Sequence, residues 1–477
     1  YTGGLGGLCL ALSLIFVGTA RRTLVWLVPL IPLLGIAASS FYSSLDRSAG
    51  GIAPFALTVE SYYILRIYSF GFAALILFLL AASQDLFKRR TWVIPLGLIL
   101  FAWVEVFGVG IEILGTWVGK EWHPFLGMAL IESEAGELKT AYFGSLGNTN
   151  FLAGYLAMLF FPVLPALSPH PSLNPGKEKT RSIGGVFRWA LPLLLLGAIL
   201  ACRSKGALLG LLFGAAIYFI AKGLAKRSST LAPKQVAHRW RGRGAVATGG
   251  VVVVLLLASS LLFFNRSVRN DWTSALSLRG ESISKRVLLA YTGLHMLSDS
   301  PWVGIGPGSF RLQFLESVGE ILETEAGEAF RSRVQNLKAF KPVHVHNDPL
   351  EVLVEWGIVG YASILLFILS VLVSAIAKLR ADPPGIRARR LGWIAGFCAA
   401  LGYSLFEFPF HLAPHLALAS VLLGLSIASA STLRSGGFRW SILPGIGIAF
   451  LLSLFLLYQG VSLGLASHLA QAAWANP

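Results

Sequence analysis

The sequence predicts an all-α integral membrane protein with about 12 transmembrane helices and one large helical loop outside the membrane. Of its 477 residues, 55% are hydrophobic and 13% are charged, and the mean hydropathy is +0.69. Soluble domains carry roughly 25% charged residues. Apolar runs such as 245–264 and 360–377 approach the ~20 residues needed to cross ~30 Å of hydrocarbon. We therefore expect lipid to be the solvent for most of the chain.

The apolar runs, taken in chain order, give the predicted spans. They lie at roughly 4–20, 23–41, 61–83, 92–116, 150–167, 188–202, 205–221, 245–264, 349–378, 391–407, 412–431 and 440–463. Every second connection is basic, and the basic connections together hold more than half of the 39 Lys and Arg. Because Lys and Arg mark the cytoplasmic side, the other connections and both chain ends are expected outside the cytoplasm.

This topology also explains the net charge of +16. The positive charge gathers in the predicted cytoplasmic connections, where contact with anionic lipid of the bilayer is expected. Nucleic acid is not an expected partner. Residues 1–264 would hold spans one to eight, 265–348 a loop subdomain, 349–463 spans nine to twelve, and 464–477 an outward tail.

The loop at 265–348 is the largest connection and is expected to be helical. Apolar residues recur at helical spacing over Ser282–Ser298, and further helices are expected at Phe310–Ala326 and Phe330–Phe340. The glycine-rich stretch Gly304–Gly308 lacks the Gly-Lys-Ser/Thr ending of a nucleotide-binding loop. It is either a structural turn or a substrate contact, and the turn is the simpler interpretation.

The loop ends in the motif that carries the most chemistry. His346-Asn347 is followed by nine residues and then by Gly357 and Gly360. We expect the nine residues to begin a helix capped by Asp348, and the glycines to allow close helix packing. A histidine held there can take a proton from a hydroxyl group, since its unperturbed pKa is near 6.5.

Other interpretations of this motif remain open. His346 can be an interfacial or helix-capping histidine without catalytic work. His344 and His346 with Asp348 can also indicate a metal site, but no fourth ligand stands at a metal-ligand spacing. We therefore assign no metal ligand and no cofactor.

Three outward cations complete the local evidence. Arg203 and Lys205 lie at a tight turn between two spans, and Arg286 lies on the first loop helix. Cations at this depth suit a lipid-linked diphosphate, to which arginine offers a planar pair of donors. Ordinary snorkelling of long basic side chains is the alternative.

These motifs resemble those of the superfamily of O-antigen ligases and O-antigen polymerases, with the related bacterial protein O-oligosaccharyltransferases. His346-Asn347-x9-Gly357-x-x-Gly360 is similar to the ligase signature at each defined position. Ser204–Ala207 resembles a Ser-Arg-Gly-Ala turn in which Lys205 replaces the arginine. The stretch from Arg286 to Phe310 resembles an arginine-led helix followed by a glycine-rich turn, and Gly147–Asn150 is also similar to the family.

The resemblance implies a helical fold of the GT-C glycosyltransferase type that uses neither a metal nor a nucleotide sugar. Such an enzyme transfers a glycan from undecaprenyl diphosphate to an acceptor at the periplasmic face of the bacterial inner membrane. The resemblance implies that His346 is the general base and that Arg286 binds the diphosphate, with Arg203 and Lys205 sharing a second cationic role. The supporting residues that it implies are Asn347, His344, Arg279 and Glu407.

The sequence leaves the acceptor and some classes of function open. Lipid A core, a growing glycan or a protein hydroxyl can each be the acceptor. A lipid-linked sugar transporter would instead use polar residues in the spans, for which Glu60, Arg66, Glu105 and Glu112 are candidates, although a structural ion pair also explains them. A non-enzymatic scaffold is a third class. The family usually places its large loop one span later, which agrees with a further helix ahead of Tyr1.

Overall fold

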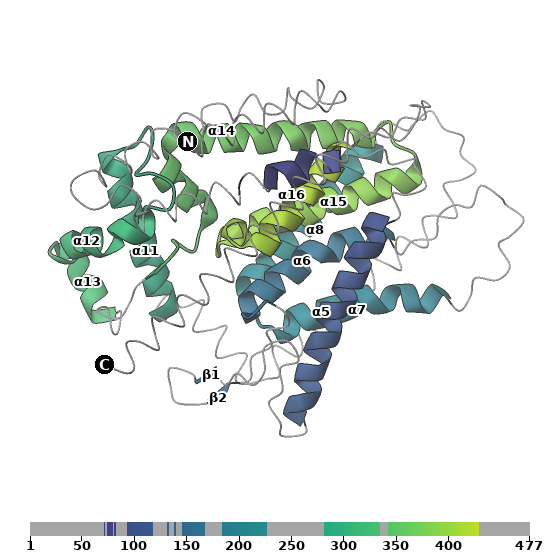
Figure 1. The fold of residues 1–477 in the computed structure, drawn as a ribbon, viewed down its shortest axis with the longest axis horizontal. Helices are drawn as coiled ribbons and strands as arrows, with labels where there is room; N and C mark the ends of the chain where they lie inside the picture. The colour runs from purple at the N-terminus through teal and green to yellow at the C-terminus, as the bar shows by residue number, and fades with distance from the viewer. Residues whose placement is uncertain are drawn as a thin grey trace, which may run out of the picture.

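The computed structural model describes residues 71, 74–79, 81–82, 93–117, 131–132, 138–139, 146–166, 184–226, 281–333 and 342–428. These residues are mostly helical, apart from one antiparallel pair of two-residue strands, β1 (Ile131–Glu132) and β2 (Leu138–Lys139). The helices are α5 (Val93–Trp117), α6 (Thr149–Ala166), α7 (Gly184–Ala201), α8 (Lys205–Lys226), α11 (Glu281–Asp299), α12 (Phe310–Leu322), α13 (Glu325–Arg333), α14 (Asp348–Leu379), α15 (Pro384–Ser404), the 3-10 helix η5 (Pro409–His411) and α16 (Ala413–Ile427). Figure 1 shows α11, α12 and α13 gathered at one end of a bundle that includes α6, α8, α14, α15 and α16.

Seven of the predicted spans coincide with helices of this bundle, namely α5 to α8 and α14 to α16. Two of these helices, over Lys205–Ala225 and Asp348–Leu379, are long and apolar enough to cross a membrane. The predicted spans 4–20, 23–41, 245–264 and 440–463 lie outside the described residues, and span 61–83 is described only in part. The described residues thus agree with a helical membrane protein.

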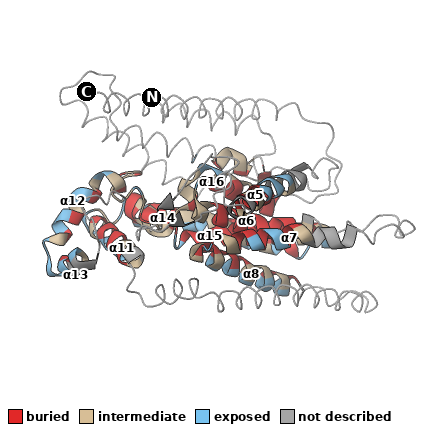
Figure 2. Cartoon of the chain, turned by 90° about the horizontal axis from the view of Figure 1, so that it is seen from below, coloured by how far each residue is buried: buried red, intermediate tan, exposed pale blue. Residues whose placement is uncertain are grey.

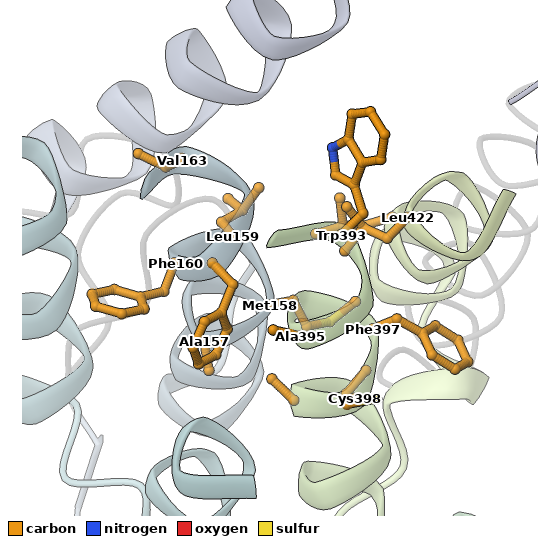
Figure 3. Packing of buried hydrophobic residues seen from close by; sticks show 14 of the residues in the cluster. Ala157, Met158, Leu159, Phe160, Val163, Trp393, Ala395, Phe397, Cys398 and Leu422 are labelled. Carbon is orange, nitrogen blue, oxygen red and sulfur yellow. The ribbon is translucent and has the colours of Figure 1, made fainter. Parts of the chain in front are cut away.

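Helix α15 lies at the centre of the bundle and is packed tightly against α8 and α6. A Cβ atom added to Gly210 of α8 would lie 2.6 Å from the carbonyl oxygen of Ala399. A Cβ atom added to Gly396 of α15 would lie 2.6 Å from the carbonyl oxygen of Met158. Small residues let helix backbones approach this closely, as is common among membrane helices. Figure 3 shows Met158 and Ala395 in the space between α6 and α15.

The outer surface of the bundle is apolar where it faces away from this core. On α5, Leu100 and Phe107 are 56% and 68% exposed, and on α14, Leu366 and Val373 are 59% and 66% exposed. Figure 2 shows the buried residues concentrated in the middle of the bundle, with exposed residues along the outer helices. Large contiguous apolar surfaces are rare on soluble monomers, so these faces fit a lipid surround.

A buried ion pair closes the bundle at the end opposite the loop helices. The Arg390 side chain is fully buried and donates to the Asp382 carboxylate, at 3.1 Å for its second hydrogen bond. It also donates to the carbonyl oxygens of Ser426 and Ala428, which are left open at the end of α16. The pair therefore joins the α14–α15 connection to the last turn of α16.

We expect Asp382→Ala to destabilise the fold by about 3–5 kcal/mol, because it leaves the Arg390 charge buried without its partner. The check is the thermal unfolding midpoint of the purified protein in detergent. Asp299→Ala is the control, since Asp299 is exposed at the end of α11. Equal midpoints for the two variants would contradict this role of the pair.

Helix α14 is broken at Gly357, whose φ of 64° and ψ of −175° are not helical. The groups freed by the break bond to the glycine-rich segment of the loop. After the break, the backbone N–H groups of Ile358 and Val359 donate to the carbonyl oxygens of Pro301 and Trp302, at 2.9 and 3.1 Å. Before the break, the carbonyl oxygens of Val354 and Glu355 accept from the backbone N–H groups of Ile305 and Gly306, at 3.1 and 3.0 Å. Gly304–Gly308 is thus a structural turn that fastens the loop to α14.

The residues before the break pack with the loop helices. Val354 joins a small core with Leu288, Leu289 and Met296 of α11 and Phe310 and Phe314 of α12. The core of the loop subdomain therefore extends into the first two turns of α14. The remaining helix, from Ile358 to Leu379, is the part that matches a membrane span.

One loop helix differs from its predicted bounds. Ser282–Ser298 is confirmed as α11, but the single helix predicted over Phe310–Ala326 is wrong, because α12 ends at Leu322 and α13 begins at Glu325. Thr324 separates the two: its hydroxyl oxygen accepts from the backbone N–H of Gly327 at 3.3 Å and so caps α13. The predicted helix at Phe330–Phe340 overlaps only the end of α13, and residues 334–341 lie outside the described part.

Candidate active site

The candidate site forms where the end of the loop meets the connection between α15 and α16. Asn347 caps α14, since its side-chain oxygen accepts from the backbone N–H of Leu350 at 2.9 Å. Its side-chain nitrogen donates to the carbonyl oxygen of Leu405 at 3.1 Å. The prediction that Asp348 caps the helix is therefore wrong. Asn347 instead both starts α14 and ties the loop to the end of α15.

His346 has a left-handed backbone conformation, with φ of 58°. Residues other than glycine rarely adopt this conformation, and such strain is concentrated at functional sites. The conformation aims the side chain at the α15–α16 connection, where Nδ1 lies 3.1 Å from Oε2 of Glu407. Phe408 packs edge-on against the imidazole ring, with 5.0 Å between ring centroids.

Glu407 joins His346 to Arg286. Its Oε1 accepts from an Arg286 guanidinium nitrogen at 2.7 Å, and its other oxygen contacts His346. The Glu407 side chain is only 5% exposed, whereas His346 and Arg286 are each 36% exposed. The carboxylate is thus a buried link between two groups that reach the surface.

This arrangement fixes how His346 can react. An ionised carboxylate only accepts hydrogen bonds, so the contact with Glu407 requires a proton on Nδ1. Nε2 then carries a lone pair, and no hydrogen-bond partner occupies it among the residues that the structure describes. A carboxylate that orients an imidazole in this way also stabilises the imidazolium that forms when Nε2 takes up a proton. In this arrangement Nε2 of the neutral imidazole is available to accept a proton.

A second cluster of polar side chains lies close to His346 in the fold, and it consists of His344, Asp348, Glu351 and His411. Glu351 is buried and accepts from His344 Nδ1 at 2.7 Å and from the Val345 backbone N–H at 2.8 Å. Asp348 accepts from His411 Nδ1 at 2.6 Å and from the Phe410 backbone N–H at 2.9 Å. The Glu351 bonds hold the loop before His346 on α14, and the Asp348 bonds hold the start of α14 against the segment that follows Glu407.

Three atoms of this cluster, from His344, Glu351 and His411, lie within 4.8 Å of one another and are of types that bind metals. Burial alone would lower the pKa of His411, but the carboxylates of Glu351 and Asp348 raise it from 6.5 to about 10. His411 is then an imidazolium at neutral pH that bridges two carboxylates. His346, which the sequence grouped with His344 and Asp348 as a possible metal ligand, faces Glu407 instead.

The raised pKa of His411 makes stability depend on pH. Because the folded state binds this proton more tightly, its stabilising effect is complete below about pH 6.5 and is lost as pH rises toward about 10. We expect the unfolding midpoint of the purified protein to fall over this interval, and to fall less in His411→Gln. Parallel curves for the two proteins between pH 6.5 and 10 would contradict the assignment.

The other predicted site residues are placed as follows. Arg203 is exposed in the turn between α7 and α8, with φ of 54°, and Lys205 begins α8. A Cβ atom on Gly206 would lie 3.2 Å from Cβ of Phe406, so this turn adjoins the segment after α15 that carries Glu407. In the described part of the chain, the Arg203 guanidinium has no hydrogen bond or ion pair. Arg279 lies outside the described residues.

Sequence reasoning missed the buried cluster, although the sequence contained a signal for it. Asp348, Glu351 and Glu355 are spaced by three and four residues, which places them on one face of α14. All three are buried, and Glu355 accepts from the Phe310 backbone N–H at 3.2 Å. An acidic face in the first turns of an otherwise apolar helix indicates partners on other segments. His411 had no comparable signal.

The comparison with protein families covers most of this site. Residues 190–365 match a family model described as O-antigen ligase. The resemblance to the O-antigen ligase family is confirmed for this part of the chain. The O-antigen ligase domain includes Lys205, Arg286 and His346, and its match ends before Glu407. No curated protein matches the chain. The domain match supports a glycosyltransferase of the O-antigen ligase and polymerase type, acting on lipid-linked glycans in a membrane.

Proposed function

We propose that the protein transfers a glycan from undecaprenyl diphosphate to an acceptor hydroxyl at the periplasmic face of the bacterial inner membrane, as an O-antigen ligase does. The bond network Arg286–Glu407–His346 supports this proposal, because an imidazole that can accept a proton lies in it together with a cation that suits phosphate. We also propose the full topology of about 12 spans and a GT-C-type fold. The active site would lie at the outward ends of α8, α14 and α15.

His346 begins the reaction in this mechanism. Its Nε2 removes the proton of the acceptor hydroxyl as the hydroxyl oxygen attacks the anomeric carbon of the glycan. Glu407 stabilises the resulting imidazolium through Nδ1. The bond between the anomeric carbon and the phosphate oxygen breaks, and undecaprenyl diphosphate leaves with the electron pair. No metal ion or nucleotide sugar takes part in this step.

Arg286 stabilises the leaving group. One of its nitrogens is held by Glu407, which leaves its other donors for the diphosphate oxygens. Stabilisation of developing charge by fixed donors is commonly the greatest single contribution to catalysis. Arg203 and Lys205 lie on a turn that adjoins the same end of α15, and we assign them the second cationic role.

Arg286→Ala is expected to weaken binding of the lipid-linked donor by at least 10-fold, since a charge-assisted hydrogen bond contributes roughly 1.5–3 kcal/mol. Donor binding to the purified protein is the measurement. Arg380→Ala removes an equal charge from an exposed position at the opposite end of α14 and is the control. Unchanged donor affinity together with slower turnover would show that Arg286 does not bind the diphosphate.

Other acceptors and another class remain as alternatives. An O-antigen polymerase or a protein O-oligosaccharyltransferase would use the same chemistry on a glycan or a protein. A lipid-linked sugar transporter is favoured by Glu105 and Glu112, which are buried on α5. The other two candidates, Glu60 and Arg66, lie outside the described residues, so the structural ion pair stays a prediction. A transporter would move lipid between leaflets without forming a glycan–acceptor bond.

A further inference from the structure

The turn Pro301–Val303 projects apolar side chains from the loop subdomain at the point where α14 begins its membrane-spanning part. Trp302 is 66% exposed and Val303 is 51% exposed. The backbone of this turn bonds to Ile358 and Val359, at 2.9 and 3.1 Å. The turn therefore has a fixed height relative to the start of the span.

The sequence of α14 sets that height. Between Ile358 and the first cation, Lys378, lie about 20 residues without charge, or roughly 30 Å of helix at 1.5 Å per residue. This length matches the ~30 Å hydrocarbon core of a bilayer. With Lys378 at the inner boundary, Ile358 lies at the outer one.

Exposed apolar side chains occur on both sides of this boundary. Ile358 and Val359 are 43% and 39% exposed, next to the turn that carries Trp302. Farther along α14, Leu366, Leu369 and Val373 follow Val359 at helical spacing and are 47% to 66% exposed. Tryptophan is enriched where lipid headgroups meet acyl chains, because its ring is apolar and its N–H is polar.

We propose that the turn Pro301–Val303 inserts into the outer headgroup–acyl boundary of the bilayer and seats the loop subdomain on the membrane. The occupant of this apolar surface is lipid, and the proposal rests on the membrane placement in the proposed function. Four backbone hydrogen bonds across Gly357 join the loop subdomain to α14, so contact of the turn with the bilayer would fix the position of both. Arg286 lies on α11 of the same subdomain. The cation would then stand at the level of a lipid-linked diphosphate.

The test is the depth of nitroxide spin labels in protein reconstituted into phospholipid vesicles. Trp302→Cys and Val303→Cys are labelled singly, and collisions with oxygen, which concentrates in lipid, are compared with collisions with a water-soluble nickel chelate. Leu315→Cys on α12 and Val373→Cys on α14 are the aqueous and lipid references, at 55% and 66% exposed. Cys9 is replaced by serine in every labelled variant, and the protein with that substitution alone gives the background, since Cys202 and Cys398 are buried.

Labels at 302 and 303 are expected to have an oxygen-to-nickel collision ratio well above that at 315 and approaching that at 373. A ratio equal to that at 315 would overturn the proposal. Quenching of fluorescence by brominated lipid gives a second measurement: Trp302→Phe is expected to lose part of the quenching seen in the unsubstituted protein, and an unchanged quenching would also overturn it. Neither measurement uses glycan transfer, so failure of the proposed enzymatic activity leaves their outcome interpretable.

Discussion

His346→Ala is expected to lower glycan transfer by about 10²- to 10⁴-fold, the range that a general base contributes. The reason is geometric, because Nε2 is the free nitrogen of an imidazole whose Nδ1 is held by Glu407. The loss should appear in turnover, while binding of the lipid-linked donor to Arg286 persists. Turnover is measured as transfer of labelled glycan by the purified protein, and donor binding is measured separately.

Two matched variants separate catalysis from folding. Alanine is strained at the positive φ of residue 346, whereas asparagine tolerates it, so His346→Asn should lose activity without added backbone strain. His295→Ala removes the histidine of another His–Glu pair, whose His295 Nε2 lies 3.1 Å from Oε2 of Glu320 at the surface, and it should retain activity. Normal turnover in His346→Asn would remove His346 from the mechanism.

Gly357→Ala is expected to destabilise the loop subdomain and the start of the span together. A Cβ atom there would lie 2.4 Å from the carbonyl carbon and oxygen of Trp302 and 2.5 Å from the backbone nitrogen of Gly304. The backbone at φ 64° and ψ −175° is in a region essentially restricted to glycine, which adds roughly 1–3 kcal/mol for a residue with a Cβ. Relief of the overlap requires the two backbones to separate, which breaks hydrogen bonds across the junction. We expect the unfolding midpoint to drop and limited proteolysis to cleave the loop.

Gly319→Ala is the matched control for this substitution. Gly319 lies within α12, and a Cβ atom there would meet nothing within 4 Å. Replacing a glycine inside a helix by alanine stabilises by roughly 0.5–1 kcal/mol. If Gly357→Ala unfolds at the same temperature as Gly319→Ala, the junction between the loop and α14 does not have the assigned role.

Hydropathy and charge were sufficient to predict where most described helices lie, because each span has to supply its own apolar length. They were not sufficient for the break in α14. The glycine pair at 357 and 360 also fits a continuous helix, and only the donors and acceptors of residues 301–306 make the break stable. Those partners are about 50 residues away in sequence, so no local pattern reveals them.

Some residues of the candidate site could likewise be predicted from local sequence, and others could not. His346 was predicted because its motif is contiguous, and Arg286 because the stretch from Arg286 to Phe310 resembles an arginine-led helix of the family. Asn347 and Asp348 are both good capping residues, so local propensity could not tell which one would cap α14. Asp348 is buried, and its carboxylate accepts hydrogen bonds from His411 and from the backbone N–H of Phe410, so Asn347 caps the helix instead. The role of Glu407 as a link also depends on tertiary structure, since it lies 61 residues from His346.

The most direct test of the proposed activity is incubation of purified protein with a labelled undecaprenyl-diphosphate glycan and each candidate acceptor in turn. We predict that the label moves to a hydroxyl of one acceptor with equimolar release of undecaprenyl diphosphate, and that His346→Asn protein shows neither product. If the wild-type protein forms no glycan–acceptor bond but moves the intact lipid-linked glycan between the leaflets of a vesicle, the protein is a transporter and the glycosyltransferase assignment is wrong.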